Sequence, residues 1–118
     1  MAVERAIVRE PGDGLSKCIS THPMRHTIDA ARARAQHATY VETLERLGLE
    51  IIRLERDDNL PDSCFVEDTA IVHAGKCLIC RSAEGARRGE VRAVEAVLRG
   101  MLDAKSASAP ATVEGGDV

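Results

Sequence analysis

The sequence predicts an α/β fold made of short repeated modules. Strand-like and helix-like segments alternate along the 118 residues in the order β, α, β, followed by β, β, α, β. The strand-like segments are short apolar runs, whereas the helix-like segments are longer and carry apolar residues at helical spacing. Because the only aromatic residues are one Tyr and one Phe, aliphatic side chains must build the core.

Two strands are expected in the first half of the chain. The first covers residues 6–9, directly before a turn-forming Pro-Gly-Asp-Gly sequence at 11–14. The second covers residues 49–54, and a charged loop at 55–63 follows it.

A long helix is expected between these two strands, from residue 28 to residue 47. Thr27 can cap its start, and Gly48 can end it. The residues predicted to form its buried face are Ala33, His37, Tyr40, Val41, Leu44 and Leu47. His37 is interpreted as a hydrogen-bonded core histidine rather than a catalytic group.

A β-hairpin is expected next, with strands at residues 70–72 and 77–80 and a turn at 73–76. His73 is then a surface residue of the turn. Cys77 and Cys80 form a Cys-x-x-Cys sequence, but in a strand this spacing sends the two sulfur atoms to opposite faces. Zinc needs converging ligands, so no metal site is predicted.

The end of the chain is expected to contain a helix, a connection and a final strand. The helix covers residues 90–102, with Val91, Val94, Val97, Leu98 and Met101 on one side. Residues 103–110 are polar and small, which favours an irregular connection. Thr112 and Val113 are expected to begin another strand.

Composition excludes several classes of function. The formal net charge of -3 gives the protein no electrostatic reason to bind nucleic acid. No apolar run approaches the roughly 20 residues that a membrane-spanning helix needs, and the first residues lack the apolar segment of a signal peptide. A cytoplasmic location is therefore expected, with four cysteines as free thiols and no cofactor.

The segment Asp62–Thr69 carries the strongest chemical signal. Its carboxylates stand where a polar loop enters an apolar run, and a carboxylate that leaves water without a partner is costly. In an extended strand, Phe65 and Glu67 would share one face, and Asp68 would lie on the other. A ring beside a carboxylate suits a planar guanidinium group. The alternative is that these acids are solvated turn and edge residues.

The residues at 61–72, Pro-Asp-Ser-Cys-Phe-Val-Glu-Asp-Thr-Ala-Ile-Val, resemble the signature of the dimethylarginine dimethylaminohydrolases. Gly14-Leu15, Arg-Arg-Gly-Glu at 87–90 and Thr-Val-Glu-Gly-Gly-Asp at 112–117 match the same family in the same order. One departure is Cys64, where the family more usually has an aliphatic residue. The resemblance implies a pentein fold, a five-bladed α/β propeller. Residues 1–118 would be the N-terminal part of its single catalytic domain, about two ββαβ-type modules that end at the Glu-Gly-Gly-Asp strand.

The resemblance also implies a reaction. In that family a cysteine thiolate attacks the guanidinium carbon, dimethylamine leaves, and water activated by a histidine releases citrulline. That cysteine and histidine lie in the family's C-terminal half and match nothing here, so the chain alone is expected to be inactive.

The resemblance assigns roles to individual residues. Glu67 and Asp68 would bind the guanidinium, Asp62 the polar end of the substrate and Arg87 its carboxylate. Phe65 would line the pocket, and Leu15 would belong to a lid. The residues expected to act in catalysis are Glu114, which would orient the catalytic histidine, and Asp68.

Other readings stay open. Arginine deiminases and amidinotransferases use similar carboxylates on the same fold. The chain could also be a non-catalytic binding or assembly module. Its expected partners are a small guanidino substrate and either a complementing C-terminal half or further copies of itself, because incomplete modules leave strand edges unpaired.

Overall fold

The computed structural model describes residues 4–118, which divide into a first unit that ends at Cys64 and a second unit, Phe65–Val118. Strands and helices alternate in the order β, α, β and then β, β, α, β, as predicted, but the last strand is Asp103–Ser106 and not the segment expected at residues 112 and 113. One sheet is parallel and the other is mixed, and the α/β fold class is confirmed. Among the described residues, no helix has both the length and the apolar content needed to cross a membrane.

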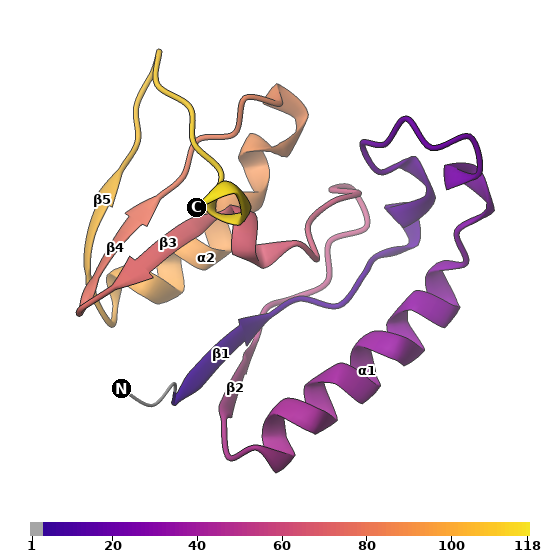
Figure 1. The fold of residues 1–118 in the computed structure, drawn as a ribbon, viewed down its shortest axis with the longest axis horizontal. Coiled ribbons are helices and arrows are strands. Elements are labelled where there is room, and N and C mark those ends of the chain that lie inside the picture. The colour runs from indigo at the N-terminus through magenta and orange to yellow at the C-terminus, as the bar shows by residue number, and fades with distance from the viewer. Residues whose placement is uncertain (1–3) are drawn as a thin grey trace. The chain divides into compact units, whose positions relative to one another are not determined.

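The first unit contains a two-stranded parallel sheet and one long helix (Figure 1). Strand β1, Arg5–Val8, pairs with β2, Glu50–Arg53, and Ala6 lies opposite Ile51. Helix α1, Ala30–Arg46, connects the two strands and packs against β2. Two short 3-10 helices, Asp13–Lys17 and Arg25–Thr27, lie between β1 and α1.

Helix α1 begins two residues later than predicted. Asp29, not Thr27, caps it, because the Asp29 carboxylate accepts a hydrogen bond from the Arg32 N–H at 3.1 Å. Gly48 ends the helix as predicted, with a φ of 89°. The predicted buried face is wrong at Tyr40 and Leu47, which are 55% and 73% exposed. Within residues 4–118, the sheet beside α1 has two strands, and Val41 is the buried residue of this helix.

The second unit contains a three-stranded sheet in the order β3-β4-β5, covered by helix α2 (Figure 1). The strands are β3, Ala70–His73, β4, Lys76–Ile79, and β5, Asp103–Ser106. Helix α2, Val91–Arg99, follows a 3-10 helix, Gly85–Glu90. Two further 3-10 helices are Val66–Asp68 and Gly115–Asp117. The core of this unit contains Cys77, Ile79, Val94 and Leu98, all at most 6% exposed.

The hairpin of β3 and β4 is confirmed. Its two turn residues, Ala74 and Gly75, have φ angles of 50° and 77°, as the tight turn that fits twisted antiparallel strands requires. His73 is exposed, as predicted, but it is the last residue of β3 and not part of the turn.

The prediction for the last sixteen residues is wrong in two places. Residues 103–106, expected as an irregular connection, form β5, which pairs in parallel with β4. Three of its four side chains are exposed, so the strand lacks an apolar pattern that sequence reasoning could find. The strand expected at Thr112 and Val113 is only a single bridge between Val113 and Arg81. Helix α2 also ends at Arg99, three residues before the expected end.

Candidate functional site

The signature acids lie in a 3-10 turn, Val66–Asp68, and not in an extended strand. The Asp68 and Thr69 N–H groups donate to the Phe65 and Val66 carbonyls at 3.1 and 3.0 Å, and the Thr69 hydroxyl also donates to Val66 O at 2.6 Å. These local hydrogen bonds compete with strand pairing, which starts only at Ala70. The predicted alternation of faces between Phe65, Glu67 and Asp68 is therefore wrong.

Both oxygens of the Asp68 carboxylate are held in place within the second unit. The Arg87 Nη1 donates to Asp68 Oδ2 at 3.1 Å, and the Gly116 N–H donates to Asp68 Oδ1 at 3.1 Å. The Asp68 side chain is 23% exposed. The structure thus brings together two of the predicted site residues, Asp68 and Arg87.

Arg87 is held on its other side by Glu90. The Arg87 Nε lies 3.2 and 3.0 Å from the two Glu90 oxygens, and its Nη2 donates to Glu90 Oε1 at 2.8 Å. Glu90 is 2% exposed. Hydrogen bonds to Glu90, and then to Asp68, raise the pKa of Arg87 above its usual range against the opposing effect of burial. Arg87 is therefore a fixed, permanently charged bridge between two carboxylates.

Sequence reasoning assigned no role to Glu90. The sequence feature that could have predicted this ion pair is the spacing of three residues between Arg87 and Glu90, at which side chains on a helical turn meet.

Glu114 is positioned by a serine. The buried Ser82 hydroxyl donates to Glu114 Oε1 at 2.6 Å, and its oxygen accepts a hydrogen bond from the Glu84 N–H at 3.1 Å. Sequence reasoning missed Ser82, which lies 32 residues away in the chain. No local pattern links the two residues.

The two glycines after Glu114 let this segment approach the signature turn closely. A side chain at Gly115 would collide with the Glu67 carbonyl oxygen and lie 2.8 Å from the Ala70 carbonyl oxygen. A side chain at Gly116 would collide with the Asp68 carboxylate. Glycine is thus required at both positions for this packing against the turn.

Glu67 and Phe65 differ from Asp68 because they are exposed. Phe65 is 40% exposed. Within residues 4–118, the Glu67 carboxylate has no hydrogen bond or ion pair. It is therefore an available acceptor for a cation.

Cys80 is a buried thiol in the same unit, 4% exposed. Burial raises the pKa of Cys80, and the Asp68 and Glu114 charges add to this, while a backbone hydrogen bond from Gly115 opposes it. The thiol is therefore a poor nucleophile at neutral pH.

Leu15 and Asp62 belong to the first unit. Leu15 is buried in the 3-10 helix Asp13–Lys17. Asp62 is 5% exposed, and its Oδ2 accepts a hydrogen bond from the Ile19 N–H at 3.0 Å. Their predicted contacts with substrate stay predictions. In the part of the chain that the structure describes, no group of three or more His, Cys, Asp and Glu residues is arranged to hold a metal ion.

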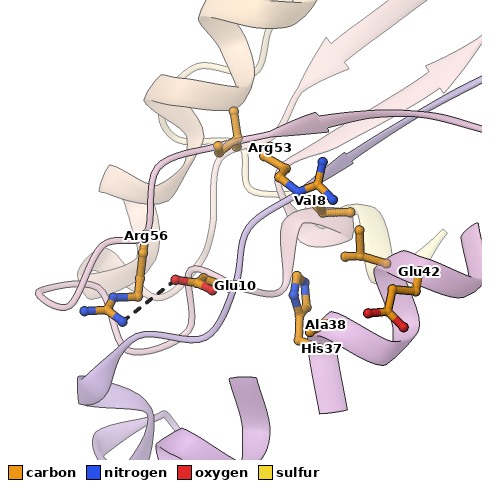
Figure 2. A pocket seen from close by; sticks show the side chains of 9 residues that line it. Val8, Glu10, His37, Ala38, Glu42, Arg53 and Arg56 are labelled. Atoms are coloured by element: carbon orange, nitrogen blue, oxygen red, sulfur yellow. Dashed lines mark ion pairs between the residues drawn. The ribbon is translucent and has the colours of Figure 1, made fainter. Parts of the chain in front are cut away.

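The first unit also has an open cavity of about 390 Å³ between α1 and the carboxyl ends of β1 and β2 (Figure 2). Its charged groups include Arg53, which pairs with Glu45 at 2.8 Å, and Arg56, which pairs with Glu10 at 3.8 Å. His37 also lines it and is half-buried. No described residue forms a hydrogen bond with the His37 imidazole. The prediction of a hydrogen-bonded core histidine is therefore wrong.

Comparison with known proteins decides the family. The model of the family described as N,N dimethylarginine dimethylhydrolase, eukaryotic, matches residues 17–114. This chain belongs to the dimethylarginine dimethylaminohydrolase family. A Streptomyces coelicolor dimethylarginine dimethylaminohydrolase is 37% identical over 119 residues, which cover 100% of this chain and 46% of the relative. A Pseudomonas aeruginosa member is 32% identical over 98% of this chain and 44% of its own length.

Solved structures of the family agree. The Pseudomonas aeruginosa enzyme complexed with citrulline matches with a TM-score of 0.93 at 29% identity, over 99% of this chain and 46% of that one. A dimethylarginine dimethylaminohydrolase adduct with S-methyl-L-thiocitrulline matches with a TM-score of 0.93 at 30% identity, over 98% of this chain and 46% of that one. These neighbours have the pentein fold, as the sequence resemblance implied. The chain corresponds to the N-terminal half of a family member and spans a little under half the length of these relatives.

Proposed function

We propose that this chain is the N-terminal part of a hydrolase that converts dimethylarginine to citrulline and dimethylamine. The observation that carries the proposal is that the signature turn of this family has two neighbouring carboxylates. Arg87 and Gly116 hold Asp68 in place, whereas Glu67 is exposed and can accept hydrogen bonds from a substrate. The modules in residues 1–118 would belong to one catalytic domain. A cytoplasmic location fits the four cysteines, which are all outside disulfides.

In this proposal the two carboxylates hold the substrate guanidinium. Glu67 has both oxygens available in an exposed turn, and the Phe65 ring at the start of this turn is also exposed. Each carboxylate has about four acceptor positions, so Asp68 can still accept hydrogen bonds from a substrate after bonding Arg87 and Gly116. A guanidinium held by several charge-assisted hydrogen bonds would present its central carbon in a defined direction.

Glu114 would orient the catalytic histidine. Ser82 bonds Oε1, which leaves Oε2 to accept the N–H of an imidazole. An acid that fixes the tautomer of a histidine in this way lets the other ring nitrogen act as a base. The histidine and the nucleophilic cysteine of the proposed mechanism come from outside the 118 residues, so catalysis requires a complementing half.

For Arg87, the contacts favour a role in fixing Asp68. Its ion pairs with Asp68 and Glu90 set the direction of the Asp68 carboxylate, which the substrate would then meet. The proposal keeps a contact of Arg87 with the substrate carboxylate as a second role. Leu15 and Asp62 complete the proposed binding set.

The experiment that tests the proposal measures citrulline formed from dimethylarginine. The chain is mixed with the remaining part of the Streptomyces coelicolor relative, and arginine is used as a second substrate. Activity on dimethylarginine that is lost in Glu67→Gln, but kept in the exposed control Glu55→Gln, supports the proposal. Activity on arginine alone would instead support a deiminase.

A further inference from the structure

The second unit has an open cavity of about 270 Å³ at the carboxyl ends of its parallel strands β4 and β5. Ile79 at the end of β4 and Ser106 at the end of β5 form one wall. The other wall is helical, with Arg88, Val91 and Glu95 at the spacing of one helix face. The carboxyl ends of parallel strands are a common place for ligands in α/β folds.

Two arginines that line this cavity have no counter-charge among the described residues. The Arg81 Nη1 donates to the Ala111 carbonyl at 3.2 Å. The Arg88 Nε donates to the Ser82 carbonyl at 2.9 Å. Within residues 4–118, neither guanidinium forms an ion pair. The contacts with backbone carbonyls therefore hold both side chains, while their remaining nitrogens are available as donors.

Glu95 is the carboxylate that lines the cavity, and it already has a cation. Its Oε2 accepts a hydrogen bond from the Arg99 Nε at 2.7 Å, and the Ser106 hydroxyl lies 3.4 Å from the same oxygen. The positive charges of Arg81 and Arg88 are therefore left over. The amino end of α2 adds a partial positive charge to this side of the cavity.

The cavity of the first unit, which lies beside α1 at the carboxyl ends of β1 and β2, differs in this respect (Figure 2). Its Arg53 pairs with Glu45 at 2.8 Å. Its Arg56 pairs with Asp58 at 3.0 Å. Arginines in this part of the module can thus be neutralised from within the chain, and in the second unit they are not.

We propose that the cavity of the second unit binds a phosphate group, either as free phosphate or as part of a small phosphate ester. Guanidinium groups form paired hydrogen bonds with phosphate oxygens, and two arginines match the double negative charge of a phosphate near neutral pH. Ile79, Val91 and Ala107 provide apolar contacts for the carbon atoms of an ester. The inference goes beyond the proposed function and does not depend on it, because the cavity shares no residue with the proposed guanidinium site.

The test is titration of the chain with phenyl phosphate and, separately, with inorganic phosphate, at constant ionic strength and followed by amide chemical shifts. We expect saturable shifts at Ile79, Val91 and Ala107 with both probes. Tighter binding of phenyl phosphate would identify an ester as the ligand, and equal affinities would identify free phosphate.

Variants test whether the two arginines bind the probe. We expect Arg81→Met and Arg88→Met each to weaken binding at least about tenfold. The control is Arg92→Met, which removes an exposed arginine of α2 that does not line the cavity and should leave the affinity unchanged. Amide shifts of β3 serve as the folding check. If a Met variant fails to fold, Arg81→Lys and Arg88→Lys replace it, because lysine keeps the charge but lacks the paired donors and should still weaken binding.

Other outcomes overturn the inference. An equal loss of affinity in Arg92→Met would show that phosphate responds only to net charge. Shifts confined to the first unit would place the phosphate elsewhere, and the absence of saturable shifts would exclude a site. Acetate binding as tightly as inorganic phosphate would contradict the choice of phosphate. Citrulline formation does not enter this test, so failure of this inference and failure of the proposed function are separate results.

Discussion

Arg87 holds Asp68 in place: its Nη1 lies 3.1 Å from Asp68 Oδ2, while Glu90 binds the rest of the guanidinium. Sequence reasoning required a cation to meet the signature carboxylates and predicted the substrate for this role. For Asp68, the structure provides the cation from within the chain. No described residue supplies a cation to the exposed Glu67. The two neighbouring acids therefore differ: Asp68 is held by Arg87, and Glu67 is available to the substrate.

Removing the Arg87 charge should destabilise the protein strongly. Arg87→Met removes the cation that pairs with the buried Glu90 carboxylate, and breaking a buried pair of this kind costs about 3–5 kcal/mol. The double variant Arg87→Met with Glu90→Met should recover much of that loss, because neither charge is then left buried. Urea unfolding monitored by circular dichroism measures both free energies. Equal losses in the single and double variants would show that the pair is not the cause.

Glu67→Gln should reduce activity without reducing stability. The exposed Glu67 has no partner in the described chain, so its loss leaves folding intact. A hydrogen bond to a charged group contributes about 1.5–3 kcal/mol, which corresponds to a loss of roughly 10- to 100-fold in kcat/KM of the completed enzyme. Steady-state kinetics and urea unfolding of the same variant provide the two readouts. A large loss of stability would contradict the assignment.

Gly115→Ala should destabilise the second unit, because the new methyl group would collide with the Glu67 carbonyl oxygen. Overpacking of this kind costs about 1–3 kcal/mol. The matched control is Gly85→Ala, where no heavy atom lies within 4 Å of the added carbon. Thermal unfolding compares the two. Similar melting temperatures for both variants would show that the Glu114–Asp117 segment does not pack on the signature turn.

Lowering the pH should reduce the free energy of unfolding of the first unit, because His37 takes up a proton more readily in the unfolded chain. Burial lowers the pKa of His37, Glu10 partly opposes this, and Arg53 adds to it. The unfolded chain therefore binds the proton more readily, and stability falls as pH drops from the unfolded value of about 6.5 towards the lower folded value. The melting temperature should decrease between pH 7.5 and 5.5, and less so in His37→Gln. The exposed His73→Gln is the control, and an equal decrease in all three proteins would exclude His37.

The fold could be read from the sequence wherever burial leaves a pattern. The hairpin turn at Ala74 and Gly75 and the α2 residues Val94 and Leu98 follow from spacing alone. The polar edge strand β5 could not be found, because an exposed strand needs no apolar residues. The candidate site could likewise be predicted only where its residues leave a local pattern in the sequence. The residue types of the signature were informative, but an extended strand was expected where local hydrogen bonds form a 3-10 turn. The pairing of Glu114 with Ser82 spans 32 residues, and no local pattern encodes it.

The most direct test of the central claim is citrulline formation from dimethylarginine by the chain mixed with the remaining part of the Streptomyces coelicolor relative. We expect activity in the mixture, none in either part alone, and a loss of roughly 10- to 100-fold in Glu67→Gln. A folded, associated mixture that forms no citrulline, or one that Glu67→Gln leaves unchanged, would contradict the proposal that this turn binds the guanidinium.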